Sequence, residues 1–200
     1  MTYSDEYKVC WFTPMRTATR STHRLLKTIG FGGLNSHIFK FPPTRREYML
    51  ISNIRNPYSR MVSLFYIYSV HKERFDLNFE NWCEYAVNDE EFDYRYQLRY
   101  ESIIKSTGRS FDKFIRIESY SEDLKTLSFI DLSKPETQEV WNNSILKNRF
   151  KNEFKFIETD GRKSWFDFYN QKLADLVFNK LEEQFNLFGY DRNSWKNGTP

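Results

Sequence analysis

The alternation of short apolar runs with amphipathic segments is the feature that most constrains how this chain can fold. Three runs have the composition of buried strands: YKVCWF at 7–12, YMLISNI at 48–54 and KFIRI at 113–117. Apolar residues at helical spacing follow the first two runs, and a longer stripe over 173–185 ends at Gly189. Strands that alternate with helices predict an α/β domain with a central, mainly parallel sheet.

Local signals predict where the helices begin and end. One helix is expected from Thr19, with GFGG at 30–33 ending it, and another from Pro57, because proline is favourable in a first helical turn. SYSE at 119–122 has the Ser-x-x-Glu form of a capping box and predicts a further helix. The stretch over roughly 72–110 is polar and mostly helical in composition.

Composition and charge limit the class of protein. A length of 200 residues suits one domain covering 1–200, and an aromatic content of 18% argues against disorder. Lys and Arg number 30 against 27 Asp and Glu, an excess of 3 that is too small to suggest nucleic-acid binding. Cys10 and Cys83 lack metal-ligand spacing and are expected to be buried free thiols in a reducing compartment. Because neither a signal peptide nor a long apolar span is apparent, a soluble intracellular protein is expected.

The loop after the first apolar run, PMRTATRST at 14–22, concentrates groups that bind anions. The first turn of a helix presents backbone N–H groups without partners, and the helix dipole favours an anion there. Hydroxyl and guanidinium groups add donors and charge, and the loop supplies them from Thr17, Thr19, Ser21, Thr22, Arg16 and Arg20. Alternatively, Thr17 or Thr19 is merely the helix N-cap and the arginines are solvated. The pattern GxxxxGKS/T is absent, which disfavours a kinase or GTPase.

A second polar loop follows the next apolar run. In IRNPYSRMVSLFY at 54–66, Arg55 stands at the expected strand end and Ser63 lies two turns into the following helix. Together they could hold a second phosphate, although Arg55 could equally form a surface ion pair and Ser63 could pack. In open parallel sheets ligands bind beyond the carboxyl ends of the strands, so both loops are expected at that edge.

The pair PMRTATRS and RNPYSRMVSLFY resembles the two cofactor signatures of sulfotransferases that use 3′-phosphoadenosine 5′-phosphosulfate (PAPS). In that family the first signature binds the 5′-phosphosulfate, and the second binds the 3′-phosphate through its Arg and Ser. FDKFIRIESYSEDLKTL at 111–127 and LADLVFNKLEEQFNLFGYD at 173–191 resemble later segments of the Golgi-type carbohydrate enzymes. The likeness is nearest to the uronyl or heparan 2-O branch, whose first loop reads KTASTS.

The resemblance implies a P-loop-like three-layer α/β/α fold, PAPS as the sulfate donor and no metal. The residues that fall on the first signature and would bind the 5′-phosphosulfate are Arg16, Thr17, Ala18, Thr19, Arg20 and Ser21. Arg55 and Ser63 fall on the second signature. Family members often place a loop over the cofactor near GRKSWFDFY, where Arg162 and Lys163 become binding candidates and Trp165 could stack on adenine or pack on the core.

Two positions of the first loop depart from the common pattern, and a third differs from the 2-O branch alone. Ala18 stands where many members carry glycine, and Arg20 stands where Thr or Ser is usual, so it could reach the cofactor or turn outward. Arg16 replaces the lysine of the 2-O branch and keeps the positive charge. Because arginine does not readily release a proton, Arg16 is expected to stabilise the charge on the leaving group.

In-line sulfuryl transfer also needs a base for the acceptor hydroxyl. Histidine suits this role because its unperturbed pKa is about 6.5. His23 could equally pack, and His71 could cap its helix, whereas His37 falls where the 2-O branch carries its base. The resemblance thus makes His37 the expected catalytic base, with Glu47 and Glu118 in reserve.

The acceptor is expected to be a carbohydrate or another small hydroxyl compound. Residues that could line its groove, or could simply form a solvated helix face, are Tyr94, Arg95, Gln97, Arg99 and Tyr100. Sulfuryl transfer from PAPS is the expected activity, and an inactive module that binds adenosine 3′,5′-bisphosphate is the alternative. Eukaryotic relatives usually carry a Golgi membrane anchor, so the lack of one predicts a bacterial or viral-type cytoplasmic protein with no nucleic-acid or membrane partner.

Overall fold

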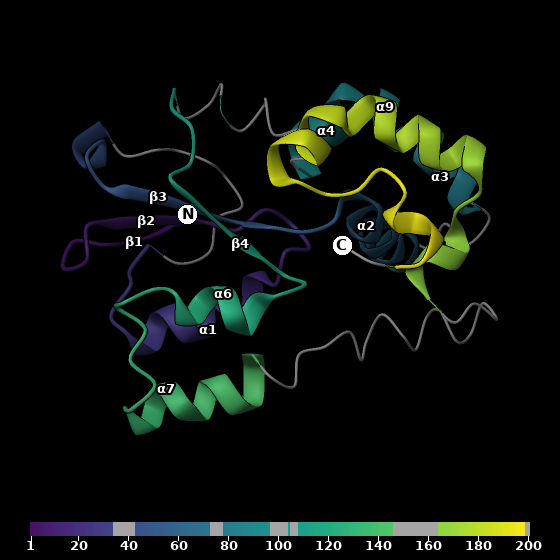
Figure 1. Ribbon diagram of the computed structural model, residues 1–200. Helices are drawn as coiled ribbons and strands as arrows, with labels where there is room; N and C mark the ends of the chain where they lie inside the picture. Colours follow the sequence, from purple (N-terminus) through teal and green to yellow (C-terminus); the bar gives the residue numbers. More distant parts are fainter. Residues whose placement is uncertain (34–42, 73–77, 97–103, 105–107, 146–163, 199–200) are drawn as a thin grey trace. The chain divides into compact units, whose positions relative to one another are not determined.

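A computed structural model describes residues 1–33, 43–72, 78–96, 104, 108–145 and 164–198. The chain divides into two compact units, each built from two separate segments (Figure 1). Unit 1 comprises Met1–Ile54 and Glu101–Arg149, and unit 2 comprises Arg55–Tyr100 and Phe150–Pro200. That 1–200 form a single domain stays a prediction.

Unit 1 contains a four-stranded, mostly parallel open sheet in the order β1-β2-β3-β4. The strands are β1 (Thr2–Ser4), β2 (Val9–Phe12), β3 (Met49–Ile54) and β4 (Lys113–Arg116). β2, β3 and β4 are parallel to their neighbours, whereas β1 pairs with β2 in the antiparallel direction. The α/β class and the three apolar strands are therefore confirmed. The carboxyl ends of β2, β3 and β4 meet at one edge, as expected for parallel strands.

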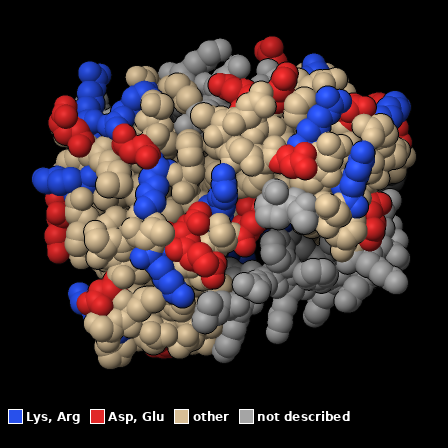
Figure 2. Space-filling view, viewed as in Figure 1, with Lys and Arg blue, Asp and Glu red and all other residues tan. Residues whose placement is uncertain are grey.

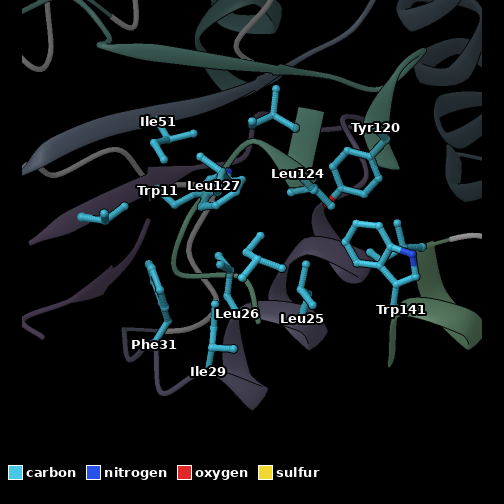
Figure 3. Packing of buried hydrophobic residues seen from close by; sticks show 14 residues of the cluster. Trp11, Leu25, Leu26, Ile29, Phe31, Ile51, Tyr120, Leu124, Leu127 and Trp141 are labelled. Atoms are coloured by element: carbon cyan, nitrogen blue, oxygen red, sulfur yellow. The ribbon is translucent and has the colours of Figure 1, made fainter. Parts of the chain in front are cut away.

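The helices of unit 1 lie on one side of this sheet (Figure 1). Among the described residues they are α1 (Thr19–Thr28), α6 (Tyr120–Lys125) and α7 (Pro135–Val140), and a π-helical turn over Trp141–Ile145 follows α7. A 3-10 turn over Pro43–Arg45 lies between α1 and β3 in the chain. Alternate strand residues supply one half of the core, and the helices supply the other half (Figure 3). The buried cluster includes Trp11 and Ile51 from the sheet, Leu25 and Leu26 from α1, and Leu124 from α6.

The end of α1 shows how local sequence sets a boundary. Gly30 follows the last helical turn with φ of 83°, in the left-handed region that glycine adopts without strain. Its N–H donates to the Lys27 carbonyl at 3.3 Å, and the Phe31 N–H donates to the Leu26 carbonyl at 3.0 Å. These two bonds form a Schellman motif, and Phe31 and Leu26 both belong to the core. The prediction that GFGG ends this helix is confirmed.

The start of α6 corrects a detail of the sequence analysis. Ser119 is the N-cap residue, as SYSE implied, but its side chain makes no capping bond to the backbone. Its hydroxyl instead donates to the Asp123 carboxylate at 2.9 Å, and the other Asp123 oxygen accepts the Arg116 N–H at 2.7 Å. The expected Ser119–Glu122 capping box is therefore wrong. A capping box does form between Ser164 and Asp167.

The described part of unit 2 is helical. Its elements are α2 (Pro57–Lys72), α3 (Phe79–Asn88), α4 (Glu90–Tyr96), a 3-10 turn (Trp165–Phe168), α9 (Gln171–Phe188) and a second 3-10 turn (Ser194–Lys196). An aromatic cluster joins them, in which the Phe79 ring contacts Phe65, Trp82, Phe168 and Tyr169. The helices expected from Pro57, within 72–110 and before Gly189 are confirmed.

Two further expectations concern the surface and the thiols. Both cysteines are buried and free, and burial raises the pKa of the Cys10 thiol to about 11. Among the helices of the described residues, none is long and apolar enough to cross a membrane. On the face drawn in Figure 2, basic side chains are mixed with acidic ones.

Candidate functional site

The loop between β2 and α1 is folded around one carbonyl group. The carbonyl of Pro14 accepts the Thr17 N–H at 3.3 Å, the Thr17 hydroxyl at 2.6 Å and the Thr19 hydroxyl at 3.2 Å. The Thr17 side chain is only 1% exposed, so its hydroxyl is committed to the loop itself. This contact explains why two of the hydroxyl-bearing residues stand where they do.

Two residues of this loop have left-handed backbone conformations without being glycine. Arg16 has φ of 65° and Ala18 has φ of 57°, and they flank Thr17. A non-glycine residue in this region costs on the order of 1–3 kcal/mol, and such strain tends to occur at ligand-binding sites. Glycine would adopt the Ala18 conformation without strain.

The N-cap of α1 is Ala18, which offers no side-chain oxygen. The interpretation of Thr17 or Thr19 as a simple N-cap is therefore wrong. Ala18 makes no side-chain capping bond, and the first turn of the helix carries no acidic residue. The first backbone N–H groups of a helix lack intrahelical carbonyl partners, so this end favours an anion.

The remaining polar residues of the first loop differ in exposure. Ser21 and Thr22 are buried, Arg16 and Thr19 are half-buried, and Arg20 is exposed. The residues expected to bind the 5′-phosphosulfate thus lie together in the loop and the first turn of α1. Their contact with that ligand stays a prediction.

A buried asparagine that the sequence analysis did not consider holds this loop against the sheet. Asn53, near the end of β3, donates through its side-chain amide to the Thr17 carbonyl at 2.6 Å. The same amide nitrogen donates to the Thr22 hydroxyl at 2.8 Å, and the amide oxygen accepts the Trp11 indole N–H at 2.9 Å. A polar residue inside the apolar run YMLISNI was the available signal.

The second loop begins directly after β3 and opens α2. Asn56 stands before Pro57, and its side-chain oxygen accepts the Tyr58 N–H at 3.0 Å, as an N-cap residue does. Arg55 donates through Nε to the Ser59 hydroxyl at 2.8 Å. Neither Arg55 nor Ser63 is exposed, at 5% and 1% respectively, so Arg55 is not a surface ion-pair partner.

A second arginine of this loop, Arg60, was overlooked and is also buried. Burial, together with the neighbouring charge of Arg55, lowers the pKa of Arg60 to about 10, while Asp93 on α4 acts in the opposite direction. Arg60 therefore keeps its charge at neutral pH. Two buried guanidinium groups therefore stand close together at the beginning of α2, with the Asp93 carboxylate acting on one of them.

The candidates for the catalytic base differ in whether the structure describes them and in how exposed they are. His37 lies outside the described residues. His23 lies within the first turns of α1 and is half-buried, and its Nε2 is 3.3 Å from the Thr13 hydroxyl at the end of β2. Glu118 is half-buried two residues beyond β4, whereas Glu47 is exposed just before β3.

Other expected site residues fall largely outside what the structure describes. Arg162, Lys163, Gln97, Arg99 and Tyr100 lie outside the described residues. The backbones of Tyr94 and Arg95 belong to α4, and the backbone of His71 belongs to α2. Trp165 is half-buried and contacts Phe166 edge-on. Within the described ranges, no three His, Cys, Asp or Glu side chains converge as metal ligands would.

Fold and site together define an α/β protein in which polar, arginine-bearing loops follow adjacent parallel strands. Comparisons with known proteins add no relative, because the chain matches no family model, no curated protein and no solved structure.

Proposed function

We propose that this protein is a PAPS-dependent sulfotransferase with a P-loop-like three-layer α/β/α fold. The observation that carries the proposal is the pair of arginine-bearing loops, each of which follows one of two adjacent parallel strands and leads directly into a helix. The ordered resemblance of both loops and two later segments to sulfotransferase signatures supports the same function.

The two loops take different parts of the donor in this proposal. The start of α1, Arg16 and the loop up to Ser21 bind the 5′-phosphosulfate. Arg55 and Ser63, both buried at the start of α2, bind the 3′-phosphate. Arg162 and Lys163 add charge from the later segment, and no metal is required.

Transfer proceeds in line, with an acceptor hydroxyl attacking sulfur while adenosine 3′,5′-bisphosphate leaves. Arg16 stabilises the negative charge that develops on the bridging oxygen. His37 accepts the proton of the hydroxyl, with Glu118 and Glu47 as alternatives. A carbohydrate or another small hydroxyl compound is the acceptor, and the cytoplasm is the proposed location.

The test is to incubate purified protein with PAPS and a panel of glycans and to analyse the products by mass spectrometry. Sulfated product is expected from at least one acceptor. Tight binding of adenosine 3′,5′-bisphosphate in calorimetry without any turnover would favour the second candidate, an inactive nucleotide-binding module. If the protein forms no sulfated product and binds no nucleotide, both candidate functions are excluded.

A further inference from the structure

Asn53 is a buried polar side chain at the centre of a hydrogen-bond network in unit 1. It is 0% exposed, and its bonds reach β2, the first loop and α1. A buried polar group without such bonds costs about 1–3 kcal/mol, so its presence among apolar strand residues has a specific structural reason.

The network uses the particular chemistry of a primary amide. The Trp11 indole N–H can only donate, so it requires the Asn53 oxygen. The Thr17 carbonyl can only accept, so it requires the Asn53 nitrogen. The Thr22 hydroxyl donates to the Ala18 carbonyl at 3.0 Å and accepts from the same nitrogen. A neutral amide satisfies all these partners, whereas a carboxylate cannot donate to any of them.

We propose that Asn53 is the positioning residue of the phosphate loop. In a trans peptide the carbonyl and the following N–H point in opposite directions. Because Asn53 holds the Thr17 carbonyl toward itself, the Ala18 N–H points away from Asn53, in the left-handed conformation that would otherwise relax. This inference rests on the proposed function, since the groups it orders are those assigned to the 5′-phosphosulfate.

The discriminating substitution is Asn53→Asp. An ionised carboxylate keeps an acceptor for Trp11 but loses the donor to the Thr17 carbonyl, whereas a protonated carboxyl group regains one donor. Burial raises the pKa of such a carboxyl group, so the donor returns as the pH falls through that raised value. We expect about 10–100-fold weaker binding of adenosine 3′,5′-bisphosphate at pH 8 than in the wild type, and partial recovery near pH 5.

Two titratable side chains, Tyr120 and His23, lie close to this network, and the experiment must control for both. Burial raises the pKa of Tyr120, whose hydroxyl bonds to Thr22, so it stays neutral between pH 5 and 8. His23 is common to the wild type and the variant, so the difference between their pH profiles removes its contribution. Tyr120→Phe is the matched variant, because it deletes a buried hydroxyl that interacts with both Thr22 and Asn53 and leaves the bond from Asn53 to the Thr17 carbonyl in place. It should bind the nucleotide as the wild type does.

Amide hydrogen exchange of residues 13–22 in the ligand-free protein provides a readout that needs no ligand. Asn53→Asp should exchange faster than the wild type over this segment at pH 8, after correction for intrinsic rates, and Tyr120→Phe should not. Where Asn53→Asp does not fold at pH 8, Asn53→Ser, which buries no charge, replaces it and should show the same faster exchange without pH recovery.

The inference would be overturned if Asn53→Asp or Asn53→Ser showed the same hydrogen exchange over residues 13–22 and the same nucleotide affinity as the wild type. It would also be overturned if Tyr120→Phe lost as much nucleotide affinity as the Asn53 variants. Failure of the wild-type protein itself to bind adenosine 3′,5′-bisphosphate would contradict the proposed function instead. In that case the exchange measurement still decides whether Asn53 orders the loop.

Discussion

At the scale of single residues, the backbone of the first loop is the clearest source of local strain. Arg16 and Ala18 both adopt left-handed conformations, and the intervening Thr17 is held by Pro14 and Asn53. The strain persists because these contacts on either side leave the loop little freedom to relax.

Substitution of Ala18 tests this strain. Ala18→Gly should maintain the free energy of unfolding or raise it by up to about 1 kcal/mol, because glycine adopts the left-handed region freely. Ala18→Val should lower it by about 2 kcal/mol, since a β-branched residue is disfavoured there. Urea denaturation of both variants measures the difference. As a control, Ala174→Gly in α9 should destabilise the protein by about 1 kcal/mol or more; a loss of similar size in Ala18→Gly would contradict the strain.

If the proposed function is correct, alanine substitutions of Arg55 and Arg16 should affect different steps of the reaction. Arg55→Ala should mainly weaken nucleotide binding, because its buried guanidinium would hold a phosphate in every bound state. Arg16→Ala should chiefly lower turnover, by about 100-fold, because it would act on charge that develops during transfer. Calorimetry with adenosine 3′,5′-bisphosphate and initial rates with PAPS separate the two effects. The reverse pattern would exchange these roles.

At the scale of elements, the segment from β2 through α1 to Gly30 shows how the two ends of one helix differ. The buried face of α1 packs on the sheet. Its N-cap residue, Ala18, makes no side-chain capping bond, whereas its carboxyl-terminal end is closed by the Schellman motif. This asymmetry fits a helix whose first turn is available for an anion.

The glycine end of α1 gives a matched pair of variants. A Cβ at Gly30 would meet nothing within 4 Å, so Gly30→Ala tests the conformational cost of its positive φ alone. We expect a loss of about 1 kcal/mol in unfolding free energy. Gly32 has equal space around a Cβ but no positive φ, so Gly32→Ala should be neutral or slightly stabilising. Thermal or urea denaturation measures both variants, and similar losses in the two would contradict the assignment of the Gly30→Ala cost to the positive φ.

At the scale of the whole molecule, the chain builds two units from interleaved segments. Among the described residues, the open sheet and the helices packed on it form one unit, and the aromatic helical cluster forms the other. The first loop belongs to unit 1, and Arg55 is the first residue of unit 2. Both units draw on residues far apart in sequence, so their folding depends on contacts of long range.

A ligand that binds only the native state should stabilise the whole molecule. At a concentration of 100 times its dissociation constant, adenosine 3′,5′-bisphosphate should raise the unfolding free energy by about 2.7 kcal/mol, or the Tm by about 5–10 °C. Adenosine 5′-monophosphate, which lacks the 3′-phosphate, should give a smaller shift at equal concentration. Differential scanning fluorimetry measures both. An equal shift with the two nucleotides would remove the assignment of Arg55 and Ser63 to the 3′-phosphate.

Much of the local structure could be predicted because its causes are local. β2, β3 and β4 lie in short stretches rich in strand-forming residues, and α1 and α9 carry amphipathic stripes that end in glycine. β1 escaped notice because three residues carry no periodic signal and depend on pairing with β2. The Ser119 capping box was predicted wrongly because Asp123, anchored to β4, competes for the same hydroxyl.

The sequence by itself determined the type and order of the main elements, and it marked both arginine-bearing loops, since these depend on residues near one another in the chain. Only the tertiary structure decided which hydroxyls are committed to the loop and that Arg60 is buried beside the charge of Arg55. It also decided that Asn53 holds Thr17, from which it is separated by 36 positions in the sequence. Burial and hydrogen-bond partners arise from segments distant in sequence, and no local pattern encodes them.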